Sequence, residues 1–331
     1  MIRAEISSLP LSRPWNAGKK EMEYSLRDFH WGREIGIQQY LQPRSLPEAL
    51  EMLAENRGKA LAIAGGTDVI PLLRRGDLKA DVLVDLMGLP QMKGIESDGE
   101  FISLGGLVTH AQVCSSSLIR GKAGLLAEAA GALGSPQIRN VATIAGNLIS
   151  GQPAADTAIP LLALNAKVRI ASQGGEREVP LNQFFLDQGK TVLDGRREIM
   201  TRIRFRGLGK NEGGCYLRLS QRKALALPIL VLAAVVTVDP EKKTIQEAAL
   251  ALGPVAPTPF RASRTEARLR GAAISEETFR MAAQSASEES GPRSSLLRGS
   301  AEYRKEMVKV FVHRALGRAV ENAGVGREEK V

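Results

Sequence analysis

Residues 143–148 read Thr143-Ile144-Ala145-Gly146-Asn147-Leu148, and residues 153–156 read Pro153-Ala154-Ala155-Asp156. The first stretch is typical of backbone shaped around a bound anion. The side chains of Thr143 and Asn147 can each form a hydrogen bond, and Gly146 lets a ligand approach the main chain where a Cβ atom would collide. Asp156 precedes the apolar run 159–164, and its carboxylate can accept a hydrogen bond from a sugar or ribityl hydroxyl. We therefore predict a ligand-binding loop at residues 143–147.

A second candidate loop lies nearer the start of the chain and reads Ala64-Gly65-Gly66-Thr67-Asp68. It follows the strand-like run 60–63 and precedes a short helix-like segment, residues 69–74. Successive free N–H groups at such a strand–glycine–helix junction form a concave anion site. Either loop taken alone is more often an ordinary turn. The two together indicate a diphosphate group held from both sides.

These two loops resemble the FAD-diphosphate loops of the flavoprotein subunit of molybdenum hydroxylases. That family includes the medium subunit of carbon monoxide dehydrogenase and the FAD domain of xanthine dehydrogenase. The resemblance runs from about Tyr40 to about Ala319, and further segments match in the family's order: Arg139-Asn140, Gly105-Gly106-Leu107-Val108-Thr109-His110, residues 216–223, residues 251–259 and Arg314-Ala315-Leu316. Ala145 departs from the pattern, because the family more often has glycine there. A methyl group is a mild change at a position whose N–H still points at phosphate.

The resemblance implies an α+β fold with two domains. We expect a two-lobed FAD-binding domain of the PCMH/vanillyl-alcohol-oxidase type at residues 36–207, with lobes at about 36–90 and 91–207. A small α+β domain, made of a three-stranded sheet plus helices, is expected at residues 213–323. The polar, glycine-rich stretch 207–214 favours a boundary at this point. Residues 1–35 match nothing in the family pattern; they are interpreted as an N-terminal extension that packs on a partner or as a misplaced start.

Local signals predict many of the individual elements. Ser45 and Glu48 form a capping box at the start of a helix. Further helices are expected at residues 109–115, 119–133, 261–269, 275–289 and 302–323, and strands of the second domain at 215–221, 230–239 and 244–252. The last helix carries a full apolar stripe at the spacing typical of a buried helix face.

The resemblance also implies which residues contact the cofactor, which this subfamily binds non-covalently. The diphosphate would be held by two groups of residues: Ala64, Gly65, Gly66, Thr67 and Asp68 in one loop, and Thr143, Ile144, Ala145, Gly146 and Asn147 in the other. Asp156 would take a hydroxyl of the ribityl or ribose part; its alternative role is a helix cap. Met200, with Ile199, lies where the family has apolar contacts to the ring system, although the core of a strand explains both residues almost as well.

Two further residues have alternative interpretations. Arg218 lies where relatives commonly have lysine. A cation there would favour the anionic reduced flavin, and the alternative is an ordinary surface arginine. His110 could indicate the covalent flavin bond that more distant relatives of the fold form. Because this subfamily binds FAD non-covalently, a helix-start histidine is the favoured interpretation.

By resemblance, the chain is an electron-transfer subunit without a catalytic site of its own. Electrons would leave the substrate at a molybdopterin centre on a large partner subunit. They would then pass through [2Fe–2S] clusters on a small partner subunit to this FAD and on to an external acceptor, in a hetero-oligomer such as a dimer of heterotrimers. Two alternatives remain open. One is a stand-alone flavin oxidoreductase of the same fold, and the other is a non-redox scaffold that has lost FAD.

Composition argues against a metal site in this chain, a nucleic-acid partner and membrane insertion. Only two cysteines and three histidines occur among 331 residues, too few for a cluster or structural metal site in this chain. The formal net charge of +9 suits a polyanion, but the basic segments lack the interleaved aromatic residues of single-stranded nucleic-acid binders, so we expect no nucleic acid partner. No apolar run reaches membrane-spanning length and the start lacks a signal-peptide core, so we expect no membrane insertion and a cytoplasmic location.

Overall fold

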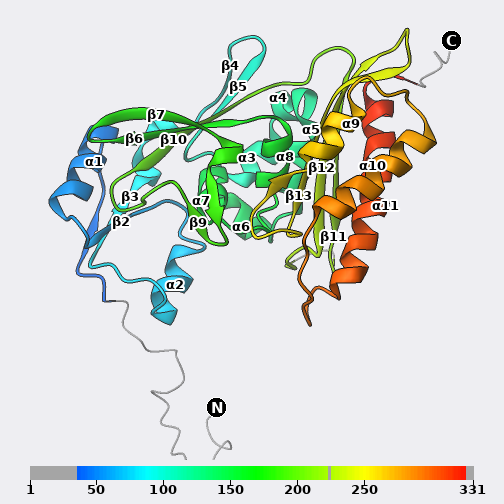
Figure 1. Ribbon diagram of the computed structural model, residues 1–331. Coiled ribbons are helices and arrows are strands. Elements are labelled where there is room, and N and C mark those ends of the chain that lie inside the picture. Colours follow the sequence, from blue (N-terminus) through cyan, green and yellow to red (C-terminus); the bar gives the residue numbers. More distant parts are fainter. Residues whose placement is uncertain (1–35, 223–224, 326–331) are drawn as a thin grey trace, which may run out of the picture. The chain divides into compact units, whose positions relative to one another are not determined.

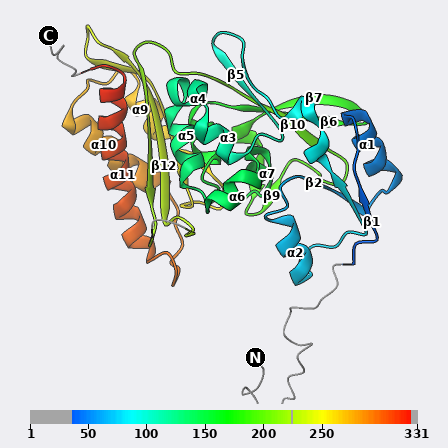
Figure 2. The same cartoon turned by 180° about the vertical axis from the view of Figure 1, so that it is seen from behind.

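A computed structural model describes residues 36–222 and 225–325 of the chain. The predicted extension 1–35 therefore lies outside the described residues. Figure 1 shows the elements in chain order, and Figure 2 shows the same ribbon from behind.

The first lobe is built on a small parallel sheet. Its strands β1 (Gln39–Leu41), β3 (Val82–Asp85) and β2 (Ala60–Ile63) lie in the order β1-β3-β2. The helices are α1 (Leu46–Glu55) and α2 (Val69–Arg75), and two short 3₁₀ turns follow, η2 (Leu86–Gly88) and η3 (Pro90–Met92). Because parallel neighbours need a crossover, the segment between β2 and β3 must leave the sheet. It does so through the predicted loop at residues 64–68.

Helix α1 begins where the sequence predicted. The hydroxyl of Ser45 accepts a hydrogen bond from the backbone N–H of Glu48 at 3.3 Å. The return bond of a capping box is shifted by one residue, since the Glu48 carboxylate accepts from the N–H of Arg44 at 2.6 Å. The cap nevertheless satisfies donors that the first turn leaves free.

The second lobe is an antiparallel sheet of five strands covered by short helices. The strand order is β4-β5-β10-β6-β7. The strands are β4 (Ile95–Ser97), β5 (Phe101–Gly105), β6 (Lys167–Ser172), β7 (Gly175–Pro180) and β10 (Ile199–Arg206), with a separate hairpin of β8 (Phe185–Asp187) and β9 (Lys190–Thr191). The helices are α3 (His110–Ser115), α4 (Ser117–Lys122), α5 (Gly124–Ala132), α6 (Pro136–Val141), α7 (Ile144–Ile149) and α8 (Ala158–Ala163), and η4 spans Leu181–Gln183.

Two local predictions in this lobe are wrong. The single helix expected at residues 119–133 is divided into α4 and α5, because Ala123 has φ −156° and ψ 50° and interrupts the helix. Gly121 and Gly124 flank the break and lower the helix propensity there. The segment expected as a loop at residues 143–147 is mostly helical, with Thr143 as the N-cap of α7.

The C-terminal part is a four-stranded antiparallel sheet with three helices. The strands are β11 (Glu212–Leu219), β12 (Leu230–Asp239), β13 (Thr244–Gly253) and the two-residue β14 (Phe260–Arg261), and the helices are α9 (Ser263–Leu269), α10 (Glu276–Glu289) and α11 (Ala301–Asn322). The sequence predicted its three long strands and missed β14. Both ribbon views show α10 and α11 side by side on one face of this sheet.

Both faces of β12 are buried, so its side chains alternate between two cores. Val231 and Ala233 belong to a core shared with α5 and α8. Leu230 and Leu232 belong to a second core, which α10 and α11 complete. The C-terminal sheet is therefore packed directly against the second lobe through one continuous apolar core.

Candidate functional site

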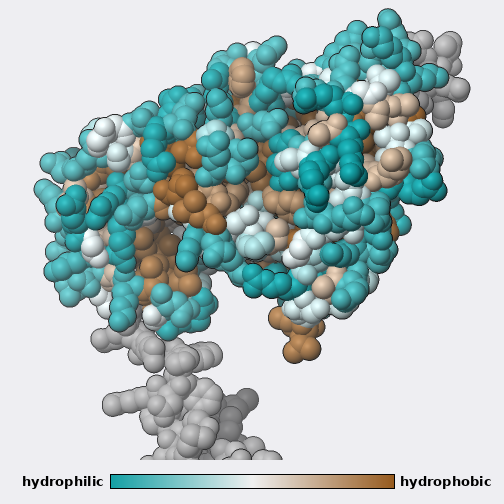
Figure 3. All heavy atoms as spheres, viewed as in Figure 1, coloured by the Kyte–Doolittle hydropathy of each residue, from teal (hydrophilic) through white to brown (hydrophobic). Residues whose placement is uncertain are grey.

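A cavity of about 540 Å³ lies where the two predicted loops come together. This volume is within the range of small-molecule and cofactor sites. Its lining comes from both lobes: residues 61–69, Leu72, Leu78, Leu86, Met92, Gly106, Leu107, His110, Leu133, Ile138, Ala142, Thr143, Ala145, Gly146, Asn147, Ile149, Ser150, Gly189, Leu193, Gly195 and 198–200. Figure 3 shows apolar side chains gathered beside α2, where the surface is hollowed.

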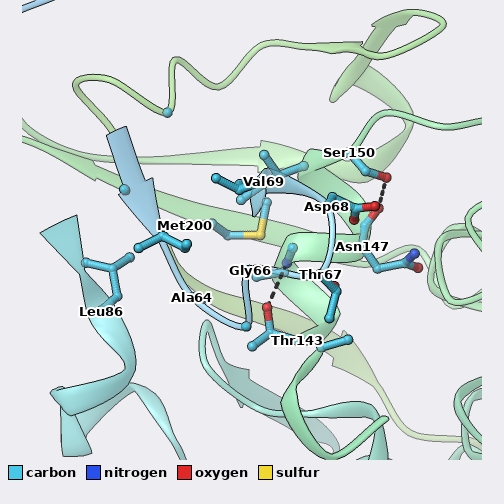
Figure 4. A pocket seen from close by; sticks show the side chains of 18 of the residues that line it. Ala64, Gly66, Thr67, Asp68, Val69, Leu86, Thr143, Asn147, Ser150 and Met200 are labelled. Carbon is cyan, nitrogen blue, oxygen red and sulfur yellow. Dashed lines mark hydrogen bonds between the residues drawn. The ribbon is translucent and has the colours of Figure 1, made fainter. Parts of the chain in front are cut away.

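Polar and apolar groups occupy different ends of the cavity. In Figure 4 the side chains of Asp68, Asn147 and Ser150 lie toward one side and that of Leu86 toward the other, with the sulfur of Met200 between them. A ligand with a polar part and an apolar ring system matches this division.

The first loop presents unpaired backbone donors. The N–H groups of residues 65–68 have no hydrogen-bond partner among the described residues. Gly66 has φ +68°, a left-handed conformation that glycine adopts without steric cost and that turns the chain from β2 toward α2. Asp68 precedes α2 but makes no side-chain cap bond. Burial raises the pKa of its carboxyl above the usual value, so a negative charge is disfavoured there.

The second loop is held in place by its own side chains. The Thr143 hydroxyl accepts a hydrogen bond from the N–H of Gly146 at 3.0 Å. The side-chain oxygen of Asn147 accepts from the hydroxyl of Thr157 at 2.6 Å. In these bonds the two side chains act only as acceptors, so the Thr143 O–H and the Asn147 NH2 group are still available as donors. The N–H groups of Thr143 and Ala145 also have no partner among the described residues. Side-chain and backbone donors of this loop therefore remain for an anion.

At Gly65 the first loop meets the end of α6, directly before the second loop. A Cβ atom at this position would lie 2.0 Å from the carbonyl oxygen of Val141 and 3.1 Å from the Cα of Ala142. A side chain on residue 65 would therefore push the loops apart. Gly146 differs from the sequence interpretation, since its Cβ would point at the Thr143 hydroxyl, 3.0 Å away, instead of into open space. It is therefore the missing side chain of Gly65, at its contact with Val141, that permits the first loop to lie close to the segment leading into the second loop.

The structure brings most of the predicted residues into the cavity wall. Ala64, Gly65, Gly66, Thr67, Asp68, Thr143, Ala145, Gly146, Asn147 and Met200 line it. Ile144 has no exposed surface and is packed in the core of the second lobe. Asp156 and Arg218 do not line the cavity and form a separate buried pair.

The pair of Asp156 and Arg218 joins the second lobe to the C-terminal sheet. The Asp156 carboxylate accepts hydrogen bonds from Arg218 Nε and from the Tyr216 hydroxyl, both at 2.8 Å. Burial raises the pKa of Asp156, while Arg218 and Tyr216 act in the opposite direction. Arg218 also donates to the Ser220 hydroxyl and the Ala226 carbonyl, so its guanidinium is tied to the following loop.

His110 is a cavity residue whose role the sequence left undecided. It is the first residue of α3 and its side chain is fully buried. Its pKa is lowered to about 4, chiefly because burial disfavours the imidazolium; the charge of Arg139 adds to this effect and the backbone of Thr143 opposes it. The ring is therefore neutral at pH 7. In the sequence, the only sign that His110 begins a helix is that it directly follows the capping residue Thr109.

Two lobes that enclose a cavity with loops of free amides define a nucleotide-cofactor-binding domain. Residues 33–205 match the family of FAD binding domains in molybdopterin dehydrogenases, and residues 215–319 match the CO dehydrogenase flavoprotein C-terminal domain. The chain belongs to this family of FAD-binding subunits of molybdenum hydroxylases. The family, the α+β fold and FAD as the cofactor are thus confirmed.

Two relatives show the extent of the likeness. The chain is 30% identical over 281 residues to the carbon monoxide dehydrogenase medium chain of Hydrogenophaga pseudoflava, covering 85% of this chain and 96% of the relative. It is 32% identical over 288 residues to the xanthine dehydrogenase FAD-binding subunit of Escherichia coli O157:H7, covering 86% and 97%.

Solved structures agree with the sequence relatives. A carbon monoxide dehydrogenase from Hydrogenophaga pseudoflava that lacks the Mo-pyranopterin moiety aligns with a TM-score of 0.82 at 30% identity, over 86% of this chain and 98% of that chain. Quinoline 2-oxidoreductase from Pseudomonas putida 86 aligns with a TM-score of 0.80 at 26% identity, over 86% and 97%. Within residues 36–222 and 225–325, no helix has the length and apolarity to cross a membrane, and no group of three or more His, Cys, Asp or Glu residues is placed to hold a metal ion.

Proposed function

We propose that this chain is the electron-transfer subunit of a molybdenum hydroxylase complex. It receives electrons from [2Fe–2S] clusters on a small partner subunit and delivers them to an external acceptor. Bound FAD supplies the redox chemistry, because its ring system accepts and releases electrons singly or in pairs. The chain's own residues bind and orient this cofactor, and oxidation of the organic substrate takes place on a large molybdopterin-binding partner.

The meeting of the two loops at one cavity carries this proposal. Free N–H groups of residues 65–68 face the same cavity as those of Thr143 and Ala145. Backbone amides aimed into one cavity are typical of sites for diphosphates. A scaffold that binds no cofactor gains nothing from backbone donors left without partners around a cavity. This arrangement therefore favours a cofactor-binding subunit over the scaffold alternative.

The residue roles follow from the placement. We propose that the backbones of residues 64–68 and 143–147 hold the diphosphate and that Met200 contacts a ring of the cofactor from the apolar end. Asp156 and Arg218 do not line the cavity and are bonded to each other. Their predicted contacts to a cofactor hydroxyl and to the flavin require this ion pair to rearrange or to share its hydrogen bonds, and they stay predictions.

The partners follow from the relatives and from the cysteine count. Relatives bear names such as medium chain and FAD-binding subunit, which are names for parts of larger enzymes. Two cysteines cannot ligate the clusters of such an enzyme, so we place the clusters and molybdopterin on the partner subunits. A cytoplasmic hetero-oligomer, with a dimer of heterotrimers as one arrangement, belongs to the same proposal.

The flavin content of the purified full chain tests the cofactor assignment. We expect bound FAD that acid precipitation releases into the supernatant, as a non-covalent cofactor should be. A colourless chain that takes up no FAD on reconstitution would contradict the proposal. Flavin that stays with the precipitate would instead reveal a covalent link.

Co-expression with candidate large and small partners tests the electron-transfer role. We expect a complex in which substrate reduces the flavin, whereas the chain alone oxidises no organic substrate. Removal of residues 1–35 should weaken assembly more than FAD binding, because those residues precede both loops in the sequence. If the isolated chain turned over a substrate as fast as any complex, the stand-alone oxidoreductase alternative would replace this proposal.

A further inference from the structure

Arg196 belongs to the second lobe, but its side chain bonds to the first. It precedes β10 in the chain and is half-buried. Its Nη1 atom donates to the carbonyl of Gly58 at 2.8 Å and to that of Ala60 at 3.4 Å. Its Nη2 atom donates to the carbonyl of Lys79 at 2.6 Å. One guanidinium therefore joins two segments of the first lobe, one at the start of β2 and the other just ahead of β3.

This guanidinium supplies hydrogen bonds that the first lobe does not provide for itself. Within the part of the chain that the structure describes, no backbone N–H donates to the carbonyl of Gly58 or of Lys79. Backbone polar groups that are shielded from water are costly without a partner. Hydrogen bonds from a charged donor are stronger than those between neutral groups, and the planar guanidinium fixes their direction. Arg196 therefore acts as a specific fastening between the lobes.

The residue before Arg196 covers the free edge of β2. In the strand order β1-β3-β2, strand β2 lies at the edge of the parallel sheet. The N–H of Ala62 donates to the carbonyl of Gly195 at 3.1 Å. Strand β2 is thus bonded to the second lobe at two residues, Ala60 and Ala62.

These bonds lie beside the cofactor cavity. Ala62 and Gly195 both belong to the cavity wall, and β2 leads directly into the loop at residues 64–68. On the second lobe the wall continues after Arg196 through residues 198–200. Since both lobes enclose the cavity, its width depends on how closely β2 is held to this segment. A binding site loses its geometry when its parts shift by more than about 0.5 Å.

We propose that Arg196 is a positioning residue for FAD, which fastens β2 to the second lobe and so holds the loop at residues 64–68 where the cofactor needs it. This inference rests on the proposed function. Arg196 acts through β2, because it is not part of the cavity lining. Without its bonds the lobes of the FAD-free chain should separate more readily, and a smaller competent population lowers the apparent affinity.

Arg196→Met tests the proposal in the full chain, because methionine keeps an unbranched stem but donates no hydrogen bond. Loss of a hydrogen bond from a charged group shifts an equilibrium about tenfold or more. We therefore expect the dissociation constant for FAD, measured by flavin fluorescence quenching, to rise about tenfold. Hydrogen exchange of the FAD-free variant should be faster at residues 58–64 and unchanged in β12, and saturating FAD should slow it again.

Two further variants complete the experiment. Arg196→Lys keeps the charge but not the planar fork, so its affinity should fall between those of the wild type and Arg196→Met. Arg197→Met is the matched control, since this neighbouring arginine is exposed and forms a 3.6 Å ion pair with Asp194 on the surface. The control should change neither the affinity nor the exchange at residues 58–64.

The outcomes distinguish this proposal from the one on which it rests. A wild-type chain that binds no FAD refutes the proposed function and this inference with it. Tight wild-type binding with equal affinity in Arg196→Met refutes the inference alone. An equal loss of affinity in Arg197→Met would show a general effect of surface charge and would also refute it.

Hydrogen exchange separates positioning from general stability. Faster exchange throughout β12 as well as at residues 58–64 would show that Arg196 only stabilises the whole fold, which contradicts the inference. If Arg196→Met does not fold, Arg196→Lys decides in its place. Weaker FAD binding with faster exchange confined to residues 58–64 supports the inference, and wild-type behaviour in both assays refutes it.

Discussion

Gly65→Ala should separate the two loops and weaken FAD binding. The new Cβ would lie 2.0 Å from the Val141 carbonyl oxygen and 2.6 Å from its carbon, whereas ordinary contacts begin at 3.4 Å. Both neighbours are backbone atoms of Val141, so either the loop at residues 64–68 or the end of α6 must move by about 1.4 Å to restore an ordinary contact. Binding constellations tolerate displacements of only about 0.5 Å. We therefore expect the dissociation constant for FAD to rise at least about tenfold, or about 1.4 kcal/mol.

The same change should also destabilise the FAD-free fold. Insertion of a methylene-sized group into a well-packed contact costs about 1–3 kcal/mol. Urea unfolding of the FAD-free protein measures this term, and flavin fluorescence quenching measures the affinity. Gly88→Ala is a matched control outside the cavity wall, because the nearest atom to its Cβ is the Pro43 carbonyl oxygen at an ordinary 3.7 Å. If Gly65→Ala behaved like Gly88→Ala in both assays, residue 65 would not make the close contact described.

Three further changes test other parts of the structure. Thr143→Ala removes the cap bond to the Gly146 N–H and should cost about 1 kcal/mol in urea unfolding; an unchanged midpoint would contradict the capping role. The pKa of His110 is about 4 in the folded chain, against 6.5 for a histidine outside the fold. The neutral ring therefore contributes fully to the free energy of unfolding above pH 6.5, and this contribution is lost as the pH falls toward 4. The FAD-free wild type should therefore lose about 3 kcal/mol more stability over this interval than His110→Phe does. Arg261→Met breaks the part-buried pair with Glu266 and the bond to the Leu162 carbonyl, and it should lower the free energy of unfolding by about 1–3 kcal/mol, which urea unfolding would show.

Local chemistry made much of the fold predictable from the sequence. Strand β12 was predicted with its observed bounds, Leu230–Asp239, because a long run of Val, Leu and Ala between turn residues has few other structures. Helix α10 was predicted to within one residue, since Ser275 caps it and its apolar positions follow the helical period. The loop at residues 64–68 was also predicted from local sequence, because two glycines between a strand-like and a helix-like segment indicate a turn.

Contacts between distant segments were beyond sequence reasoning. The pairing of Asp156 with Arg218 joins residues 62 positions apart, and no local pattern announces it. Gly65 was predicted only as one of the residues that hold the diphosphate, whereas its closest neighbour is the backbone of Val141. His110 was visible as a helix-start residue, but its complete burial follows only from the packing around it.

The C-terminal sheet contributes no residue to the described cavity lining, yet it is joined to the lobe that carries the second loop. One face of β12 shares a core with α5 and α8, so the sheet and the second lobe cannot separate without exposing apolar surface. Arg261 crosses this contact to the carbonyl of Leu162 at 3.0 Å, and Arg218 crosses it to Asp156 at 2.8 Å. Asp156 is followed directly by Thr157, whose hydroxyl holds the side chain of Asn147 in the cavity wall. We therefore infer that a shift of the C-terminal sheet is passed to the second loop by the Arg218–Asp156 and Thr157–Asn147 hydrogen bonds, which the Asp156–Thr157 peptide bond joins.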